Sequence, residues 1–220
     1  MRTKTKTLIM QRLADAARFG YHHYTTGTLD DPSKVARLIR KFALTYDTEV
    51  SRFTKHRRRR SGEATAALYV LERDYTTPRY WFALIATEGI GRIHTYEQLK
   101  DMRQERLALD GYELLHDGRS WSWRMTRETV HYWRERIHTV AALQPERRRI
   151  DHDAQGAFDV DAEKILASLY AAPGFRLVRR QIGELVTFIR GEWTRLRPDS
   201  NVCPRWRTFL GYVRRLPNAL

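Results

Sequence analysis

Hydrophobic residues recur at helical spacing towards both ends of the chain. Apolar positions three or four residues apart run from about Thr7 to Phe19, and another run follows Asp31 and Pro32, a pair typical of a helix start. Helical spacing returns after Asp161, a predicted cap. We therefore predict N-terminal helices and a helical C-terminal region. The apolar positions that mark them are Leu8, Ile9, Leu13, Ala16 and Ala17; Val35, Leu38, Ile39, Phe42, Ala43 and Tyr46; Ile165, Leu166, Leu169 and Tyr170; Val178, Ile182, Leu185, Val186, Ile189 and Trp193; and Trp206, Phe209, Leu210 and Val213.

The middle of the chain has a different pattern, in which aromatic and β-branched residues fill short runs. Two pairs of such runs predict two hairpins, the second around the turn residues Asp117-Gly118. Helical patterns that begin near Thr95 and at Thr126 follow the two hairpins. The order ββαββα predicts a four-stranded antiparallel sheet with helices on one face, and so an α+β fold. The predicted strands are Ala64 to Arg73, Arg79 to Thr87, Tyr112 to His116 and Ser120 to Met125.

Three segments are predicted to be irregular. Tyr21 to Thr28 is polar and aromatic and is expected to be a loop. Arg52 to Arg60 is a run of like charges, and because such runs do not fold on their own we expect a loop or an arm. Residues 144–160 hold a proline, three consecutive arginines and an acidic cluster, which predicts a linker. It would separate an α+β domain (residues 1–143) from a helical basic domain (residues 161–220).

The net charge of the chain indicates the class of its binding partner. The 220 residues include 40 Lys and Arg against 26 Asp and Glu, a formal net charge of +14. A chain this basic repels itself, which costs folding stability. The usual compensation is a polyanion, most often nucleic acid, whose condensed counterions are released on binding. Most of the cations are arginine, which suits bidentate phosphate contacts and stacking on bases.

Two segments concentrate the positive charge. From Gly174 onwards there are ten arginines and three acids, and the other concentration is the predicted arm. Contacts of such side chains to phosphates fix orientation without reading sequence; alternatively, long cationic side chains simply solubilise helix faces. The candidate nucleic-acid-binding residues are Arg52, Lys55, His56, Arg57, Arg58, Arg59, Arg60, Arg176, Arg179, Arg180, Arg205, Arg207, Arg214 and Arg215.

A sheet covered by helices on one face leaves the other face open. Aromatic side chains there could stack the bases of a single strand. Tyr69, Tyr80 and Trp121 are the candidates because they lie beside basic positions. The alternative is that these aromatics belong to the core, as residues at strand spacing usually do.

A catalytic role has few candidates. His22 and His23, followed by Tyr24, could transfer protons in metal-independent RNA cleavage, with arginines stabilising phosphate charge. A structural loop or a phosphate contact is the alternative for the same residues. The chain has no Walker A loop, no G-x-S-x-G motif and a single cysteine, Cys203. We therefore predict no metal and no cofactor.

The single cysteine and the absence of a long apolar run favour a reducing compartment. No stretch approaches the length of a membrane span, and Asp15 interrupts the apolar positions near the N-terminus, which favours a helix over a signal peptide there. We expect a cytoplasmic protein that does not contact a membrane.

Several short motifs resemble an uncharacterised protein family found on plasmids and integrative conjugative elements of proteobacteria. The resemblance extends over nearly the whole chain and implies a context of mobile DNA in a bacterial cytoplasm. The family has no assigned activity, so no catalytic residue is carried over. The motifs are Thr7 to Ala14, Tyr24 to Thr28, Gly111 to Leu114, Trp121 to Thr126, Pro173 to Phe175 and Tyr212 to Leu216.

Together these features predict a nucleic-acid-binding protein, for DNA or RNA, dominated by contacts to the phosphate backbone. It would act in mobile-element maintenance, transfer or defence, also as a subunit of a nucleoprotein complex with other proteins. A metal-independent nuclease or RNA-processing enzyme with a His/Tyr/Arg site is one alternative. A basic adaptor that meets an acidic protein partner is the other.

Overall fold

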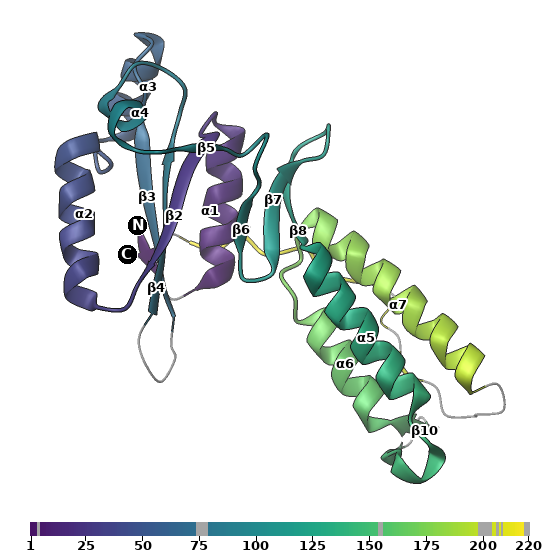
Figure 1. Cartoon of the computed structure of the whole chain (residues 1–220). Helices are drawn as coiled ribbons and strands as arrows, with labels where there is room; N and C mark the ends of the chain where they lie inside the picture. The colour runs from purple at the N-terminus through teal and green to yellow at the C-terminus, as the bar shows by residue number, and fades with distance from the viewer. Residues whose placement is uncertain are drawn as a thin grey trace. The chain divides into compact units, whose positions relative to one another are not determined.

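In the computed structural model the described residues are 1–3, 5–73, 79–153, 156–197, 204–205, 207 and 209–217. They form an α+β protein, as predicted (Figure 1). The chain divides into two compact units. The first comprises Met1–Leu107, Leu114–Trp121 and Arg215–Leu220, and the second comprises Ala108–Glu113 and Ser122–Arg214.

The first unit is built on a mixed five-stranded sheet in the order β1-β3-β4-β2-β5. The predicted hairpin of β3 and β4 is present and antiparallel, and its turn, residues 74–78, lies outside the described residues. Only the pairing of β1 with β3 is parallel. The strands are β1 (Arg2–Thr3), β2 (His23–Leu29), β3 (Ala66–Arg73), β4 (Arg79–Ala86) and β5 (Lys100–Asp101).

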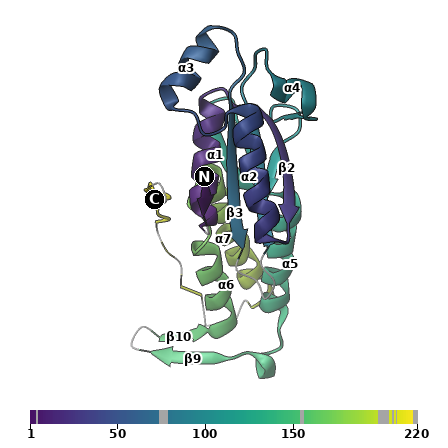
Figure 2. The same cartoon turned by 90° about the vertical axis from the view of Figure 1, so that its left-hand side faces the viewer.

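Helices cover both faces of this sheet, not one face as predicted. Figures 1 and 2 show α2 (Pro32–Tyr46) and α1 (Lys6–Arg18) on opposite sides of the central strands. Val35 and Phe42 of α2 are buried in one cluster with the alternate positions of β3 and β4, such as Leu68. Both predicted helices are confirmed, and Asp31 accepts a hydrogen bond from Ser33 N as the N-cap of α2.

The predicted four-stranded sheet is wrong, because the segment expected to be a loop is strand β2. Its seven residues pair with Tyr80 to Ala86 of β4, from His23↔Ala86 to Leu29↔Tyr80, and so occupy the edge that a second hairpin would need. Gly27 lies opposite Phe82, and a Cβ atom on it would come within 2.7 Å of that ring. The second hairpin instead joins a three-stranded sheet of β6 (Leu107–Leu109), β7 (Tyr112–His116) and β8 (Trp121–Met125).

Two further local predictions are wrong in the first unit. The short helix expected to begin at Thr95 is α4 (Arg92–Tyr96), which ends where the prediction began, and β5 follows it. The expected arm is helix α3 (Arg52–Arg60). The charge run folds because neighbouring segments supply acceptors for its cations, as described below.

The second unit contains three helices packed against one another, α5 (Arg127–Ala142), α6 (Val160–Tyr170) and α7 (Arg176–Leu196) (Figure 1). The predicted caps are confirmed for α5, where Thr126 accepts from Thr129 N, whereas α6 is capped by Asp159 and not by Asp161. The predicted linker is folded. It contains a 3₁₀ turn (Pro145–Arg147) and a hairpin of β9 (Ile150–Asp153) and β10 (Gly156–Asp159), and it lies inside the second unit.

The last predicted helix is absent over residues 209–217, and Trp206 lies outside the described residues. Residues 211–213 instead pass against Gly174, where Val213 N donates to the Gly174 carbonyl at 3.1 Å. A Cβ atom on Gly174 would lie 2.3 Å from the Gly211 carbonyl oxygen, so only glycine permits this approach. Among the described residues, no helix is both long enough and apolar enough to cross a bilayer.

Candidate nucleic-acid interface

Helix α3 forms from a sequence that is almost entirely cationic because its ends suit that charge. Ser51 caps the N-terminus by accepting from Thr54 N at 3.2 Å. Arg57 to Arg60 occupy the last turn, where cations interact favourably with the negative end of the helix dipole. Gly62, with φ of 75°, follows the helix in the left-handed region that glycine favours.

One side of α3 is fastened to the first unit. Lys55 Nζ donates to the Thr48 carbonyl at 2.7 Å, Arg58 Nη1 to Asp47 Oδ2 at 2.9 Å, and Arg59 Nη1 to the Phe19 carbonyl at 2.9 Å. Burial lowers the pKa of Lys55. These three candidate residues therefore hold the helix in place, because their cationic groups donate hydrogen bonds to acceptors within the protein.

The other side of α3 faces solvent and is both basic and aromatic. We call it the α3 surface; Phe53, at its centre, is 88% exposed. A hollow of about 620 Å³ lies along it. Its exposed residues are Arg52, Phe53, His56, Arg57 and Arg60.

The second concentration of charge forms a groove in the second unit, about 420 Å³ in volume. Arg176, Arg179 and Arg180 line it from α7, and Arg207 lines it from the segment that follows. We call it the arginine groove. None of the described residues that line it is Asp or Glu. Its lining residues are Tyr170, Arg176, Arg179, Arg180, Gly183, Val186, Arg207, Phe209 and Leu210.

Arg179 and Arg207 also build the walls of the arginine groove. Arg179 Nε donates to the Leu210 carbonyl at 2.8 Å, and its guanidinium carbon lies 3.6 Å from the centre of the Tyr212 ring. The Arg207 guanidinium lies 5.0 Å from the centre of the Tyr170 ring, and its backbone N donates to the Tyr170 hydroxyl. These contacts hold the irregular segment beside α7.

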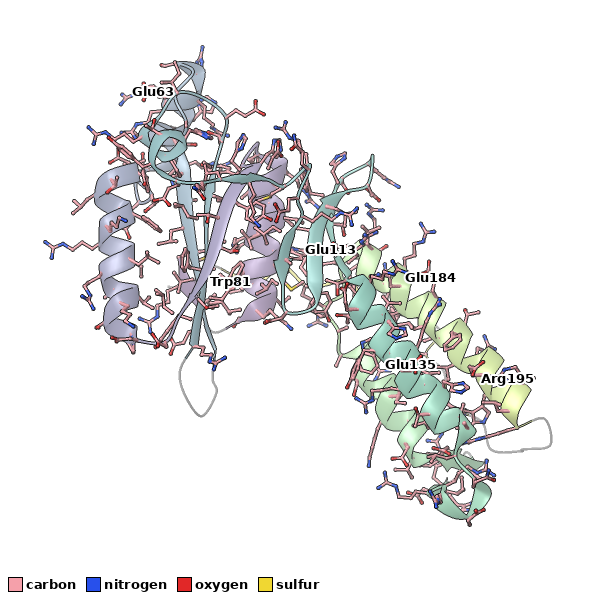
Figure 3. All side chains as sticks on the ribbon, in the orientation of Figure 1. Glu63, Trp81, Glu113, Glu135, Glu184 and Arg195 are labelled. Carbon is pink, nitrogen blue, oxygen red and sulfur yellow. The ribbon has the colours of Figure 1, made fainter. Side chains whose placement is uncertain are left out.

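The Arg180 side chain extends into solvent from the groove. It pairs at 3.1 Å with Glu184, one turn further along α7 (labelled in Figure 3), and both side chains are more than half exposed. An exposed pair of this kind contributes about 0.3–0.5 kcal/mol, so a phosphate can displace the carboxylate at small cost.

The remaining candidate arginines do not line this groove. Arg205 pairs with Asp153 and lies over the Phe158 ring, and Arg215 pairs with Asp15 of α1 at 2.8 Å. Arg214 is exposed. Arg205 and Arg215 thus use their charge to hold the C-terminal segment through ion pairs. They differ in this from Arg176, Arg179, Arg180 and Arg207, which line the groove.

The aromatic residues predicted to stack bases do not form an open face. Tyr80 is 3% exposed within the cluster under α2, and Trp121 is 6% exposed and stacks on His22 with ring centres 5.4 Å apart. Tyr69 is partly buried, and burial raises its pKa to about 12. Because both side chains are buried, Tyr80 and Trp121 do not offer an open ring face to a base.

The three catalytic candidates point to different places. His22 Nε2 donates to the Ala17 carbonyl, His23 packs against His94 with ring centres 5.0 Å apart, and the buried Tyr24 hydroxyl donates to the Arg106 carbonyl. Burial raises the pKa of Tyr24 to about 12. The geometry does not assemble one acid–base site from them.

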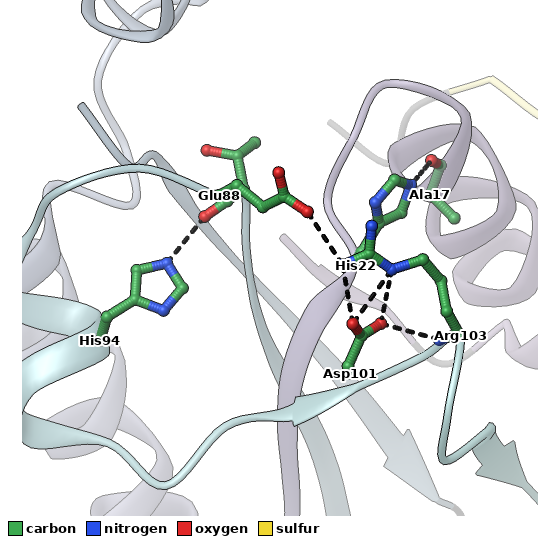
Figure 4. A network of polar contacts seen from close by, with 7 residues as sticks. Ala17, His22, Glu88, His94, Asp101 and Arg103 are labelled. Atoms are coloured by element: carbon green, nitrogen blue, oxygen red, sulfur yellow. Dashed lines mark hydrogen bonds and ion pairs between the residues drawn. The ribbon is translucent and has the colours of Figure 1, made fainter. Parts of the chain in front are cut away.

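His23 instead lies beside a polar network that the sequence did not predict. Figure 4 shows this network of Glu88, His94, Asp101 and Arg103. Arg103 bridges Asp101 at 2.7 Å and Glu88 at 2.9 Å, and His94 Nε2 donates to the Thr87 carbonyl. Hydrogen bonds from Arg103 lower the pKa of Asp101 to about 2. Arg103 balances only part of the negative charge of Asp101 and Glu88, and its two contacts connect β5 to the loop after β4.

Metal ligation has no support in the described part of the chain, where no three His, Cys, Asp or Glu side chains form a group that could hold an ion. Comparison of the chain with protein-family models, curated proteins and solved structures found no match. The arginine groove and the α3 surface are the two concentrations of exposed positive charge described above.

Proposed function

We propose that this protein binds nucleic acid through its phosphate backbone. The observation that carries the proposal is the arginine groove, where three arginines from α7 and Arg207, 27 residues beyond Arg180, line one hollow that holds no acid among its described lining residues. Arginine presents donors in a fork that matches phosphate oxygens, and several in one groove favour a polyanion over a single anion.

The α3 surface supports the same proposal as a second contact. Arg52, His56 and Arg60 follow one another at intervals of four residues, so they lie along one side of the helix. Since Lys55, Arg58 and Arg59 already have partners inside the protein, the helix is held firmly enough to present this row. A fixed row of cations binds phosphates with less loss of entropy than a free arm.

The resemblance to proteins of mobile elements suggests where this binding takes place. We propose that the protein acts in the cytoplasm on the nucleic acid of a plasmid or conjugative element, alone or in a nucleoprotein complex. Backbone contacts alone suit such a role, because they hold nucleic acid without selecting a sequence.

The test is a salt series of binding to labelled DNA and RNA. The logarithm of the binding constant should fall linearly with the logarithm of salt concentration, with a slope of about −0.9 per phosphate neutralised in duplex DNA and about −0.7 in a single strand. The Arg176→Ala/Arg180→Ala variant should weaken binding and make the slope shallower by one to two such contacts.

The matched control is Arg37→Ala/Arg40→Ala, which removes two exposed arginines from α2, outside both surfaces. It changes the net charge equally and should leave the slope close to that of the wild type. Equal losses in the two variants, or no binding by the wild type at low salt, would contradict the proposal.

A further inference from the structure

We infer that the arginine groove takes a single strand and stacks its unpaired bases on Phe209 and Tyr212. This inference rests on the proposed function and narrows it to one class of nucleic acid. Tyr80 and Trp121, which were expected to stack bases, are buried. Two exposed aromatics, Phe209 and Tyr212, lie instead beside arginines that would bind phosphates.

Phe209 lines the groove, is 67% exposed and has no polar atom. Tyr212, three residues on, is 65% exposed. Large apolar rings are usually buried, and two of them exposed beside one cationic groove indicate a surface that binds a partner with flat apolar faces. Nucleobases have such faces.

Arg179 contacts both rings, Phe209 and Tyr212, from its position in the groove. Its guanidinium carbon lies 5.5 Å from the centre of the Phe209 ring and 3.6 Å from that of Tyr212, while its Nε holds the Leu210 carbonyl between them. The two rings are therefore positioned before binding, which reduces the entropy lost when a base stacks on them. Arg176, Arg180 and Arg207 line the same groove, where phosphates would bind.

A duplex cannot use these rings. Its bases are stacked on one another, so their faces are covered, and a protein that holds only its backbone gains nothing from phenylalanine. A groove that combines cations with aromatic side chains is the arrangement that binds single strands without sequence preference. The two occupants thus differ in what they require: a duplex requires only the arginines, whereas a single strand requires the rings as well.

The experiment measures binding of the full chain to three probes of equal length: oligothymidylate, the same backbone with abasic sites throughout, and a DNA duplex. The wild type should bind oligothymidylate most tightly. Phe209→Ala should weaken that binding about 5- to 150-fold, the range for loss of one stacked base, with an unchanged salt slope. Its binding to the abasic strand should stay at the wild-type value.

Tyr132→Ala is the matched control, because Tyr132 is also an exposed ring, 54% exposed, with the Arg136 guanidinium 5.6 Å from its centre, but it lies on α5 outside the groove. It should bind all three probes like the wild type. Tyr212→Leu tests the second ring while it keeps an apolar side chain under Arg179.

Two results would overturn the inference, and they are distinguishable. If the wild type binds the abasic strand or the duplex as tightly as oligothymidylate, the proposed function stands and the single-strand inference fails. If the wild type binds none of the three probes at low salt, the proposed function fails as well.

Discussion

Asp159 and Arg197 form a buried ion pair in the second unit. Arg197 Nη1 donates to Asp159 Oδ2 at 3.1 Å, and the two residues are 8% and 1% exposed. The same aspartate caps α6, where its Oδ1 accepts from Asp161 N and Ala162 N at 3.0 Å. Arg197 also donates to the carbonyls of α5, at Ala141 and Val140, so the pair joins the start of α6 to the ends of α5 and α7.

We expect Asp159→Ala to lower the free energy of unfolding by about 3–5 kcal/mol, because it leaves the Arg197 charge buried without a counter-ion and removes a helix cap. Burial lowers the pKa of Arg197, and the Asp159 carboxylate opposes that shift. Urea unfolding followed by circular dichroism measures the change.

The control for this prediction is Glu184→Ala, which removes one partner of an exposed pair on α7 and should cost at most about 0.5 kcal/mol. Losses of equal size in the two variants would show that the buried pair contributes no more than a surface pair.

Asp159 also illustrates why the linker was mispredicted. Pro145, the arginines that follow and the acids near Asp151 have the composition of a linker. Three charges of this segment are nevertheless paired within the unit: Arg149 with Asp161, Asp153 with Arg205, and Asp159 with Arg197. Composition reports the charges but not their partners, which are far apart in sequence. The helices on either side were predictable because their spacing and caps are local.

Strand β2 and helix α3 were missed for related reasons. Gly27 and the surrounding threonines resemble a loop, yet the glycine leaves room for the Phe82 ring on the neighbouring strand. The arginines of α3 repel one another in isolation, yet the Phe19 carbonyl and Asp47 accept from them. The arginine groove was half predictable: its arginines were found from charge, whereas Phe209 was assigned to a helix that does not form.

The two sides of α3 give a prediction that separates binding from stability. Arg57→Ala/Arg60→Ala should weaken nucleic-acid binding and lower the midpoint of thermal unfolding only slightly, because both side chains are exposed and their interaction with the helix dipole is weak at the surface. Lys55→Ala should lower that midpoint more, since Lys55 donates to the Thr48 carbonyl from a half-buried position. Binding titrations and thermal unfolding of both variants check the assignment. It is wrong if Arg57→Ala/Arg60→Ala binds normally.

The Asp101–Arg103 contact predicts a dependence on pH in the acid range. The folded-state pKa of Asp101 is about 2, below its ordinary value of 3.8, so the contact stabilises the fold fully above 3.8 and is lost as the pH falls towards 2. The difference in unfolding free energy between the wild type and Asp101→Asn should therefore shrink over this interval. Urea unfolding at several acid pH values measures it.

Arg103→Gln provides the control for that titration. It should remove the same acid-dependent contribution, and in the Asp101→Asn background it should change the pH dependence little, because the two side chains act as one pair. A wild-type curve parallel to that of Asp101→Asn throughout would show that this carboxyl group has an ordinary pKa.

Two substitutions of Gly183 test whether nucleic acid binds in the arginine groove. It lines the groove in the middle of α7, is exposed, and has open space where a Cβ atom would be built. Gly183→Ala should raise the free energy of unfolding by about 0.5–1 kcal/mol, since glycine weakens a helix interior, and should leave binding unchanged. Gly183→Glu should fold equally well but weaken binding, because it places a carboxylate between the arginines and the phosphates. Thermal unfolding and binding titrations of the two variants distinguish these effects. If Gly183→Glu binds like Gly183→Ala, nucleic acid does not enter this groove.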